Sequence, residues 1–147
     1  MTEQLQTMVV SSDLENRRTL STILMRLGLD PICISTVKEC REMLDRACTG
    51  LIFCDRYFVD GNYRDILAAS RSSKGQPCVV LTCRHTHSEY QEATDLGIFD
   101  VISAPCVPTD VEWMIIQAKR REEQRAQLNF NPVQPSRLRK ARTAGTA

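Results

Sequence analysis

The sequence has few aromatic residues and no long apolar run. Aromatic residues make up 5% of the 147 residues, and tryptophan occurs once, as Trp113. No stretch approaches the roughly 18 consecutive apolar residues that a membrane-spanning helix needs. The opening residues, MTEQLQTM, are too polar for a secretory signal. Membrane and secreted proteins are therefore not expected, and we expect a cytoplasmic protein.

Two sequence patterns that would indicate a particular type of site, a CxxC cysteine pair and a glycine-rich phosphate loop, are also absent. No pair of cysteines has CxxC spacing, and the cysteine count, seven, is odd. We therefore expect reduced thiols that pack like small apolar side chains, not a disulfide framework. No glycine-rich phosphate loop follows the first apolar run, where Ser11, Ser12 and Asp13 stand instead. This argues against an enzyme that binds a phosphate-bearing cofactor there.

The composition is that of an ordinary globular domain, with 42% hydrophobic and 25% charged residues. The net charge of +1 hides an uneven distribution. Residues 1–118 hold 16 acidic and 11 basic residues, whereas residues 119–147 hold 2 acidic and 8 basic ones. Apolar periodicity ends at about Gln127. We therefore expect one domain over residues 6–122, followed over residues 123–147 by a helix end and a flexible basic tail.

Short apolar runs alternate with stretches of helical periodicity. We predict strands over residues 7–10, 31–34, 51–54, 77–81 and 101–102. Helices are predicted over residues 14–27, 36–47, 65–70 and 86–96 and after residue 108, and a polar loop over residues 55–62. Because parallel strands need crossover helices, this order predicts an α/β fold, a single (βα)5 doubly wound parallel sheet of five strands.

Local signals mark the ends of these helices. Thr36 and Thr86 are each followed three residues later by a glutamate, the form of a capping box. Gly28 stands where a glycine ends a helix, and Thr109 or Asp110 is expected to cap the last one.

Ligands bind such sheets at the carboxyl ends of the strands, near the switch in strand order. The predicted strand ends carry Ser11, Ser12, Asp13, Asp55, Thr82, Cys83, Arg84 and Ala104. Other recognisable positions are Val9-Val10, Asp60-Gly61, Leu96-Gly97 and Ala104-Pro105. In this order and spacing, the sequence resembles the receiver domains of response regulators, chemotaxis-type domains with a flavodoxin-like fold. The resemblance implies two-component signalling, with Asp55 as phospho-acceptor and Thr82 as the hydroxyl that relays the signal.

The sequence departs from the family at several positions. The acidic pair that holds Mg²⁺ with the acceptor falls on Ser11 and Ser12, which we expect to be spacers and backbone caps. The phosphate-pairing lysine falls on Ala104, and the switching aromatic on Val101. Mg²⁺ prefers oxygen ligands that include carboxylates, so Asp55 would be nearly its only charged ligand.

Three side chains and one carbonyl could compensate for the missing acidic pair and the missing lysine. The Tyr57 carbonyl is a family-type Mg²⁺ ligand, and Asp13 stands close to the missing acidic pair. Arg56 and Arg84 could replace part of the lost positive charge. Asp13 is also well placed to cap the first helix.

These departures predict a stand-alone degenerate receiver that is not an enzyme. It would act as a protein-interaction module whose Mg²⁺-dependent phosphorylation is impaired or absent. The alternative is a functional phosphorelay receiver that a histidine kinase phosphorylates on Asp55, through a site reorganised around Asp13 or an arginine. The expected partner is a histidine kinase or a downstream signalling protein, and a homodimer through the last helices is also expected.

Three further patterns are open to other interpretations. Cys54, Cys83 and Cys106 near strand ends, with His85 and His87, could hold zinc, but their spacing matches no common zinc motif. The basic stretch over residues 119–125 could contact nucleic acid, but it also suits a solvated helix end, so nucleic acid is not the expected partner. Trp113 belongs either to the core or to a partner surface formed by the last strand and helices.

Overall fold

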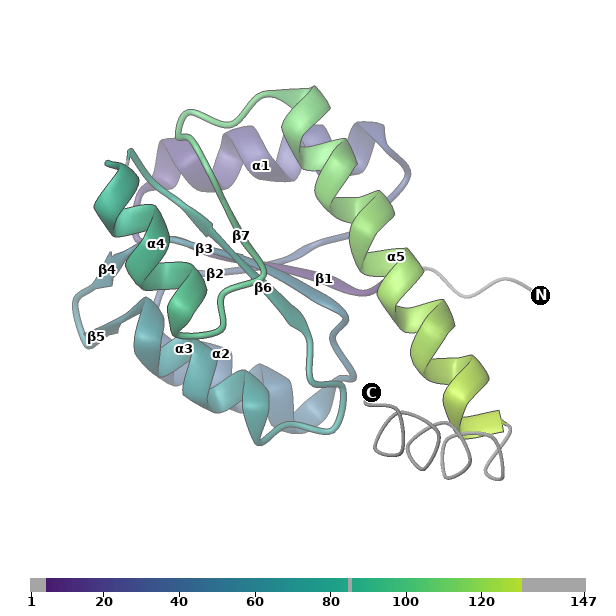
Figure 1. Ribbon diagram of the computed structural model, residues 1–147. Helices are drawn as coiled ribbons and strands as arrows, with labels where there is room; N and C mark the ends of the chain where they lie inside the picture. The colour runs from purple at the N-terminus through teal and green to yellow at the C-terminus, as the bar shows by residue number, and fades with distance from the viewer. Residues whose placement is uncertain (1–4, 85, 131–147) are drawn as a thin grey trace.

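Five parallel strands form the centre of the molecule in the computed structural model, which describes residues 5–84 and 86–130 (Figure 1). The strands are β1 (Thr7–Val10), β2 (Ile32–Ile34), β3 (Leu51–Cys54), β6 (Cys78–Thr82) and β7 (Asp100–Ile102). Their order in the sheet is β2-β1-β3-β6-β7, and β1 lies with Met8 opposite Ile32 and Ile52. The predicted sheet is therefore confirmed. Each of its strands begins and ends within one residue of the predicted positions.

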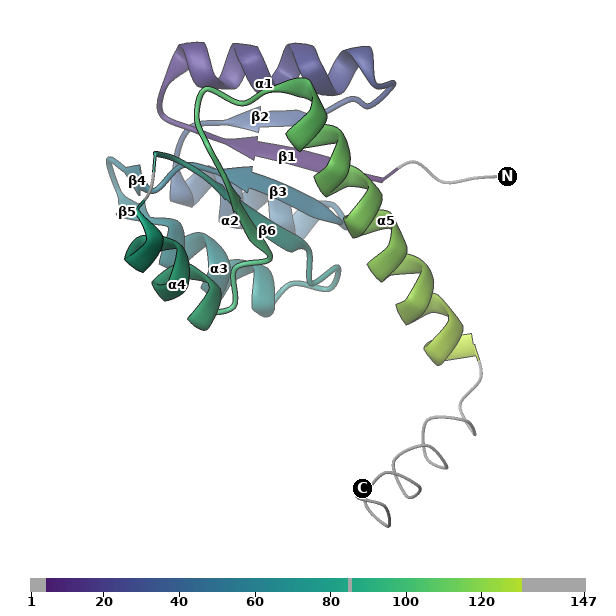
Figure 2. The same cartoon turned by 45° about the horizontal axis from the view of Figure 1, so that its top comes forward.

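Five helices cover the two faces of this sheet (Figure 2). They are α1 (Leu14–Arg26), α2 (Val37–Arg46), α3 (Tyr63–Arg71), α4 (His87–Asp95) and α5 (Pro108–Phe130). One buried apolar cluster joins α1 and α5 to strand residues such as Phe53, and the other joins α2, α3 and α4 to strand residues such as Ile52. Consecutive residues of β3 thus face opposite helical layers, as expected of a strand buried on both sides.

The helix starts follow side chains that bind free backbone amides. Asp13 caps α1, and Thr86 forms the predicted capping box of α4. Thr36 caps α2, where Asp60 also accepts hydrogen bonds from two first-turn amides. Gly28, with φ of +86°, follows α1 in the left-handed conformation that favours glycine.

The start of α5 differs from the prediction. The helix begins at Pro108, so Thr109 and Asp110 lie in its first turn and do not cap it. Proline suits the first helical position because the amide it lacks would have no partner there. An acidic residue in the first turn is favoured by the helix dipole, which explains why Asp110 could be mistaken for a cap.

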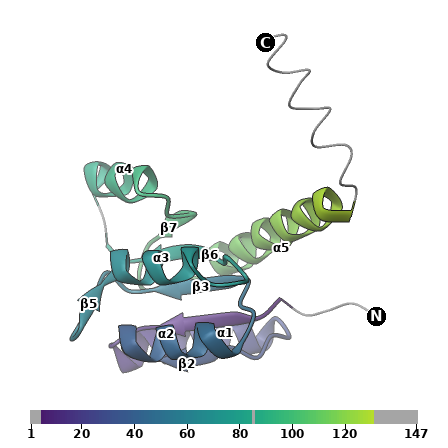
Figure 3. The same cartoon turned by 90° about the horizontal axis from the view of Figure 1, so that it is seen from below.

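Two segments predicted to lack regular structure are ordered. The predicted loop over residues 55–62 contains a small antiparallel hairpin, β4 (Tyr57–Phe58) and β5 (Gly61–Asn62). Helix α5 continues through residues 127–130, and its last turns extend away from the sheet (Figure 3). Good helix formers at residues 119–127 sustain this helix without an apolar stripe. The remaining tail, residues 131–147, lies outside the described residues.

All seven cysteines are free in this structure. Four are buried: Cys40, Cys54, Cys78 and Cys106. Within the described ranges, no helix is long and apolar enough to cross a membrane.

Candidate functional site

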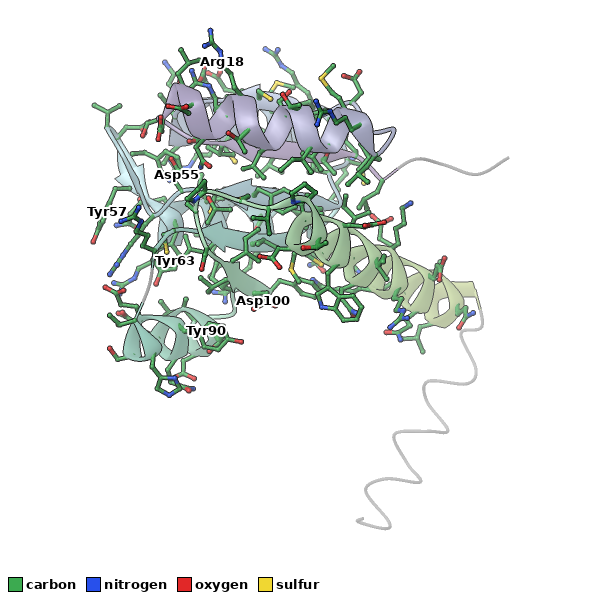
Figure 4. All side chains as sticks on the ribbon, turned by 90° about the horizontal axis from the view of Figure 1, so that it is seen from above. Arg18, Asp55, Tyr57, Tyr63, Tyr90 and Asp100 are labelled. Carbon is green, nitrogen blue, oxygen red and sulfur yellow. The ribbon has the colours of Figure 1, made fainter. Side chains whose placement is uncertain are left out.

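Asp55 lies at the carboxyl edge of the sheet, directly after β3 (Figure 4). It lines a cavity of about 600 Å³ that is formed by the segments following β1, β3, β6 and β7. Asp13, Thr82, Arg84 and Ala104 line the same cavity. The topology thus brings together Asp13 and Ala104, which are 91 positions apart in the sequence.

Three side chains contact the Asp55 carboxylate. Ser11 Oγ donates to Oδ2 at 2.6 Å, and Asn16 Nδ2 donates to Oδ1 at 2.7 Å. Thr82 Oγ1 lies 3.3 Å from Oδ1 and 3.2 Å from the carbonyl oxygen of Cys54. Every donor is electrically neutral, so both carboxylate oxygens are satisfied without a cation.

Ser11 and Ser12 have different roles. Ser11 is 1% exposed, and its hydroxyl accepts a hydrogen bond from the Asp13 amide while it donates to Asp55. Ser12 is exposed. Ser11 therefore caps the turn after β1, and it also orients Asp55.

Asn16 is the residue of this site that the sequence analysis missed. It lies in the first turn of α1, and its amide nitrogen is also within 3.4 Å of Ser11 Oγ and of Thr82 Oγ1. The available signal was a polar amide in the first turn of the helix that follows β1. That turn starts at the same edge of the sheet as Asp55, so a side chain there can reach the carboxylate.

Burial raises the pKa of the Asp55 carboxyl above its ordinary value. The hydrogen bonds from Ser11, Asn16 and Thr82 oppose this change because they stabilise the ionised form. Desolvation outweighs them, and the nearby charge of Asp13 adds to it. The folded protein therefore binds this proton more tightly than the unfolded chain does.

The raised pKa predicts how an Asp55→Asn variant behaves with pH. The stability that Asp55 contributes is lost as pH rises from the ordinary aspartate pKa through the raised folded value. Asparagine does not titrate, and it can still accept from Asn16 and donate to Ser11. The free energy of unfolding of the variant, relative to the parent, should therefore increase with pH and then level off.

Urea unfolding at a series of pH values from about 4 to about 8 measures this difference. Asp45→Asn, at an exposed position on α2, is the matched control. If the difference in free energy of unfolding between Asp55→Asn and the parent stays constant with pH, or decreases as pH rises, the pKa of Asp55 is not raised in the folded protein.

The basic residues near Asp55 do not contact it. Arg56 Nη1 lies 2.7 Å from Glu89 Oε2, and its guanidinium lies 5.2 Å from the centre of the Tyr57 ring. Arg84 lines the cavity. Between residues 5 and 130, His85 excepted, neither arginine donates a hydrogen bond to Asp55.

The remaining predicted positions lie around the cavity or behind it. Asp13 Oδ1 accepts from the Glu15 amide, as a helix cap, and Asp13 also lines the cavity. Tyr57 lies in β4 at the cavity wall, with its side chain 65% exposed. Val101, at the switching position, is buried in the cluster beneath α2, α3 and α4.

These residues do not fit a magnesium ion. In the part of the chain that the structure describes, no three Asp, Glu, His or Cys side chains come close enough together to hold a metal. The carboxylate of Asp55 already accepts hydrogen bonds on both oxygens, one of them from an amide nitrogen. Mg²⁺ requires oxygen ligands in near-octahedral arrangement, usually one or two carboxylates together with water molecules.

The three cysteines near the strand ends do not form one group. Cys54 belongs to the core cluster beneath α2, α3 and α4, and Cys83 packs against that cluster, whereas Cys106 belongs to the cluster on the other face of the sheet. Burial raises the pKa of Cys106 to about 12 and that of Cys54 well above its ordinary value. Both thiols are therefore protonated at neutral pH and suit packing better than metal binding. His87 begins α4, and His85 lies outside the described residues.

Trp113 lies at the surface and not in the core. Its side chain is 52% exposed on α5, and it lines a depression of about 320 Å³ together with Asp100 and Ile102 of β7. Ile116, one turn further along α5, is 38% exposed. Two apolar side chains of α5 are therefore exposed, and Trp113 lies beside the edge strand of the sheet.

No protein-family model and no curated protein matches this sequence. Solved structures do match. The receiver domain of a putative LuxO repressor protein from Vibrio parahaemolyticus aligns with a TM-score of 0.77 at 12% identity, over 86% of this chain and 98% of that one. The chemotaxis response regulator CheY4 of Vibrio cholerae aligns with a TM-score of 0.70 at 14% identity, over 79% and 99%.

A third match is the Saccharomyces cerevisiae co-crystal of the histidine phosphotransfer protein Ypd1 with the receiver domain of Ssk1. It aligns with a TM-score of 0.69 at 13% identity, over 78% of this chain and 88% of that one. The chain thus has the flavodoxin-like fold of response regulator receiver domains, which confirms the expected fold class.

Proposed function

We propose that this chain is a two-component signalling module that works by binding a protein partner, and that Mg²⁺-dependent phosphorylation of Asp55 is impaired or absent. The observation that carries this proposal is the set of three neutral hydrogen-bond donors around Asp55. These neutral donors stabilise the Asp55 carboxylate. In a phospho-receiver, a metal ion and a lysine would balance the negative charge at this position.

The charge balance supports impaired phosphorylation. A phosphoryl group brings about two negative charges, and Ser11, Asn16 and Thr82 offer only neutral donors. A hydrogen bond to a charged group is worth about 1.5–3 kcal/mol. Two missing cationic partners therefore correspond to about a 100- to 10,000-fold loss in rate or occupancy.

The position of α4 supports a binding role that does not depend on phosphorylation. Three polar contacts connect α4 to its neighbours: Arg56–Glu89 at 2.7 Å, Arg64–Glu92 at 2.5 Å and Tyr90 Oη–Asp100 Oδ1 at 3.4 Å. Figure 4 labels Tyr90 and Asp100. The Tyr90–Asp100 contact holds α4 against β7, and Trp113 is exposed beside the same strand. A histidine kinase or a downstream signalling protein is the partner class that fits a receiver fold, and a second copy of the chain would also cover Trp113 and Ile116.

The alternative is a working phosphorelay receiver. The cavity of about 600 Å³ in front of Asp55 has room for a phosphoryl group, and Arg84 lies at its wall. In this alternative, Arg84 turns toward the phosphoryl group and Asp13 leaves its capping position to bind the metal.

Incubation with acetyl phosphate, with and without Mg²⁺, separates the two proposals. Intact-mass spectrometry should find less than about 1% of the protein carrying a phosphoryl group in either condition, because the cationic partners are missing. The Asp55→Asn variant, which lacks the acceptor, defines the background. Stoichiometric, Mg²⁺-dependent modification that this variant loses would establish the alternative in place of our proposal.

A further inference from the structure

A further pocket lies at the amino ends of β6 and β7, whereas Asp55 follows the carboxyl end of β3 in the same parallel sheet. Its volume is about 230 Å³. Helix α3, the turn before β6, the segment between α4 and β7, and α5 all contribute to its wall. Four separate parts of the chain therefore meet around one small space.

Two arginines define the character of this pocket. Arg71 of α3 donates a hydrogen bond to the carbonyl of Leu96 and packs over Gly97, where an added Cβ atom would collide with the guanidinium. Arg121 of α5 places Nη1 3.0 Å from Cys78 Sγ. Each guanidinium carries five N–H donors, so each is anchored at one nitrogen and retains donors for a ligand.

The lining of this pocket is positively charged, although the carboxylate of Glu122, the neighbour of Arg121 in the sequence, lies close enough to raise the pKa of the Cys78 thiol. Across residues 5–84 and 86–130, no carboxylate lines this pocket, and neither Arg71 nor Arg121 takes part in an ion pair. Two guanidinium groups that face one cavity raise its electrostatic potential and favour an anionic occupant.

A third arginine holds the edge of the pocket in place. Gln76 adopts a left-handed conformation, with φ of +42°, which is uncommon for a residue other than glycine. Arg125 donates to the Gln76 carbonyl and to its side-chain oxygen, both at 3.2 Å. The basic stretch of α5 thus builds this pocket: Arg121 lines it, and Arg125 fixes the turn beside it.

We propose that this pocket binds a small oxyanion that carries a short apolar group, a ligand of the phosphomonoester class. Guanidinium groups bind phosphoryl oxygens with paired, charge-assisted hydrogen bonds. Leu67, Val79 and Phe99 supply an apolar wall beside the two arginines. The volume is below the roughly 300–1,000 Å³ typical of sites for larger organic ligands, which favours a phosphate with one small substituent over a nucleotide.

Titration of the full chain with phenyl phosphate and with inorganic phosphate, at constant ionic strength, tests this site by NMR. Both ligands should produce saturable shifts in the amide signals of Gln76, Gly97 and Phe99. Phenyl phosphate should bind at least about threefold more tightly, because its ring contacts the apolar wall.

Two variants and one control assign the effect to the arginines. Arg71→Gln and Arg121→Gln should each weaken phenyl phosphate binding at least about tenfold, the effect of one charge-assisted contact. Arg41→Gln makes the same change of charge at an exposed position on α2, outside this pocket, and should leave the affinity unchanged. Unchanged amide signals outside the pocket show that each variant is folded. If one arginine variant fails to fold, the other still provides the test.

Three results would overturn the proposal: no saturable shift, equal weakening by Arg41→Gln, or shifts centred on Asp55 and Thr82. The last result would place the anion at the carboxyl edge of the sheet. Because this readout does not depend on covalent modification of Asp55, its failure can be distinguished from a failure of the proposed function.

Discussion

A variant that carries Ser11→Asp, Ser12→Asp and Ala104→Lys together should accept a phosphoryl group on Asp55 in the presence of Mg²⁺. We expect its rate to exceed that of the parent protein by about 100- to 10,000-fold, the factor for two charge-assisted interactions of about 1.5–3 kcal/mol each. The three changes supply what the site lacks, namely two carboxylates for the metal and one cation for the phosphoryl group.

The geometry of the site makes this restoration feasible. Ser11 Oγ lies 2.6 Å from Asp55 Oδ2, so a carboxylate at position 11 comes directly beside the acceptor. Two adjacent carboxylates repel each other unless a divalent cation lies between them, which ties their ionisation to Mg²⁺. Ala104 lines the same cavity, where there is room for a lysine side chain to reach toward Asp55.

Phosphorylation of this variant is measured by intact mass after incubation with acetyl phosphate over a range of Mg²⁺ concentrations. The same variant with Asp55→Asn added is the matched control, since it keeps the new charges and lacks the acceptor. Mg²⁺ should also raise the melting temperature of the restored variant, because the ion binds only the folded state. A folded variant that binds Mg²⁺ and still takes up no phosphoryl group would show that missing charges are not the cause of the impairment that we propose.

The fold could be predicted from the sequence because its signals are local. The run Leu51–Cys54 is apolar throughout and forms a strand buried on both faces, and Thr86 with Glu89 forms the expected capping box. The predicted cap of α5 was wrong because aspartate is favoured both at the cap and in the first turn of a helix. The helical residues 127–130 were missed because they lack the apolar stripe that was used to define a helix.

The site was only partly predictable because it depends on contacts between distant segments. The positions of Asp55 and Thr82 follow from the strand ends, and the structure brings their side chains within 3.3 Å. Two further contacts, those of Asn16 and Arg56, involve residues that are close in space but distant in the sequence. Asn16 reaches Asp55 across 39 residues, and Arg56 turns to Glu89 across 33 residues.

Phe53→Ala should be the most destabilising single substitution among those considered. Phe53 has no exposed surface and lies on the central strand β3, opposite Val9 of β1 and Val80 of β6. Truncating a buried phenylalanine costs about 3–5 kcal/mol because apolar contacts are lost and a cavity remains. Domains of this size have a total free energy of unfolding of about 5–15 kcal/mol, so the variant should unfold at much lower urea concentration.

Val59→Ala provides the control for this prediction. Val59 lies between β4 and β5 and is 89% exposed, so its truncation should change the free energy of unfolding by less than about 0.5 kcal/mol. Urea unfolding of the two variants beside the parent, followed by circular dichroism, measures both values. A loss below about 1 kcal/mol for Phe53→Ala would contradict the packing of α1 and α5 against β3. That packing holds the first turn of α1, and with it Asn16, against the edge of the sheet where Asp55 lies.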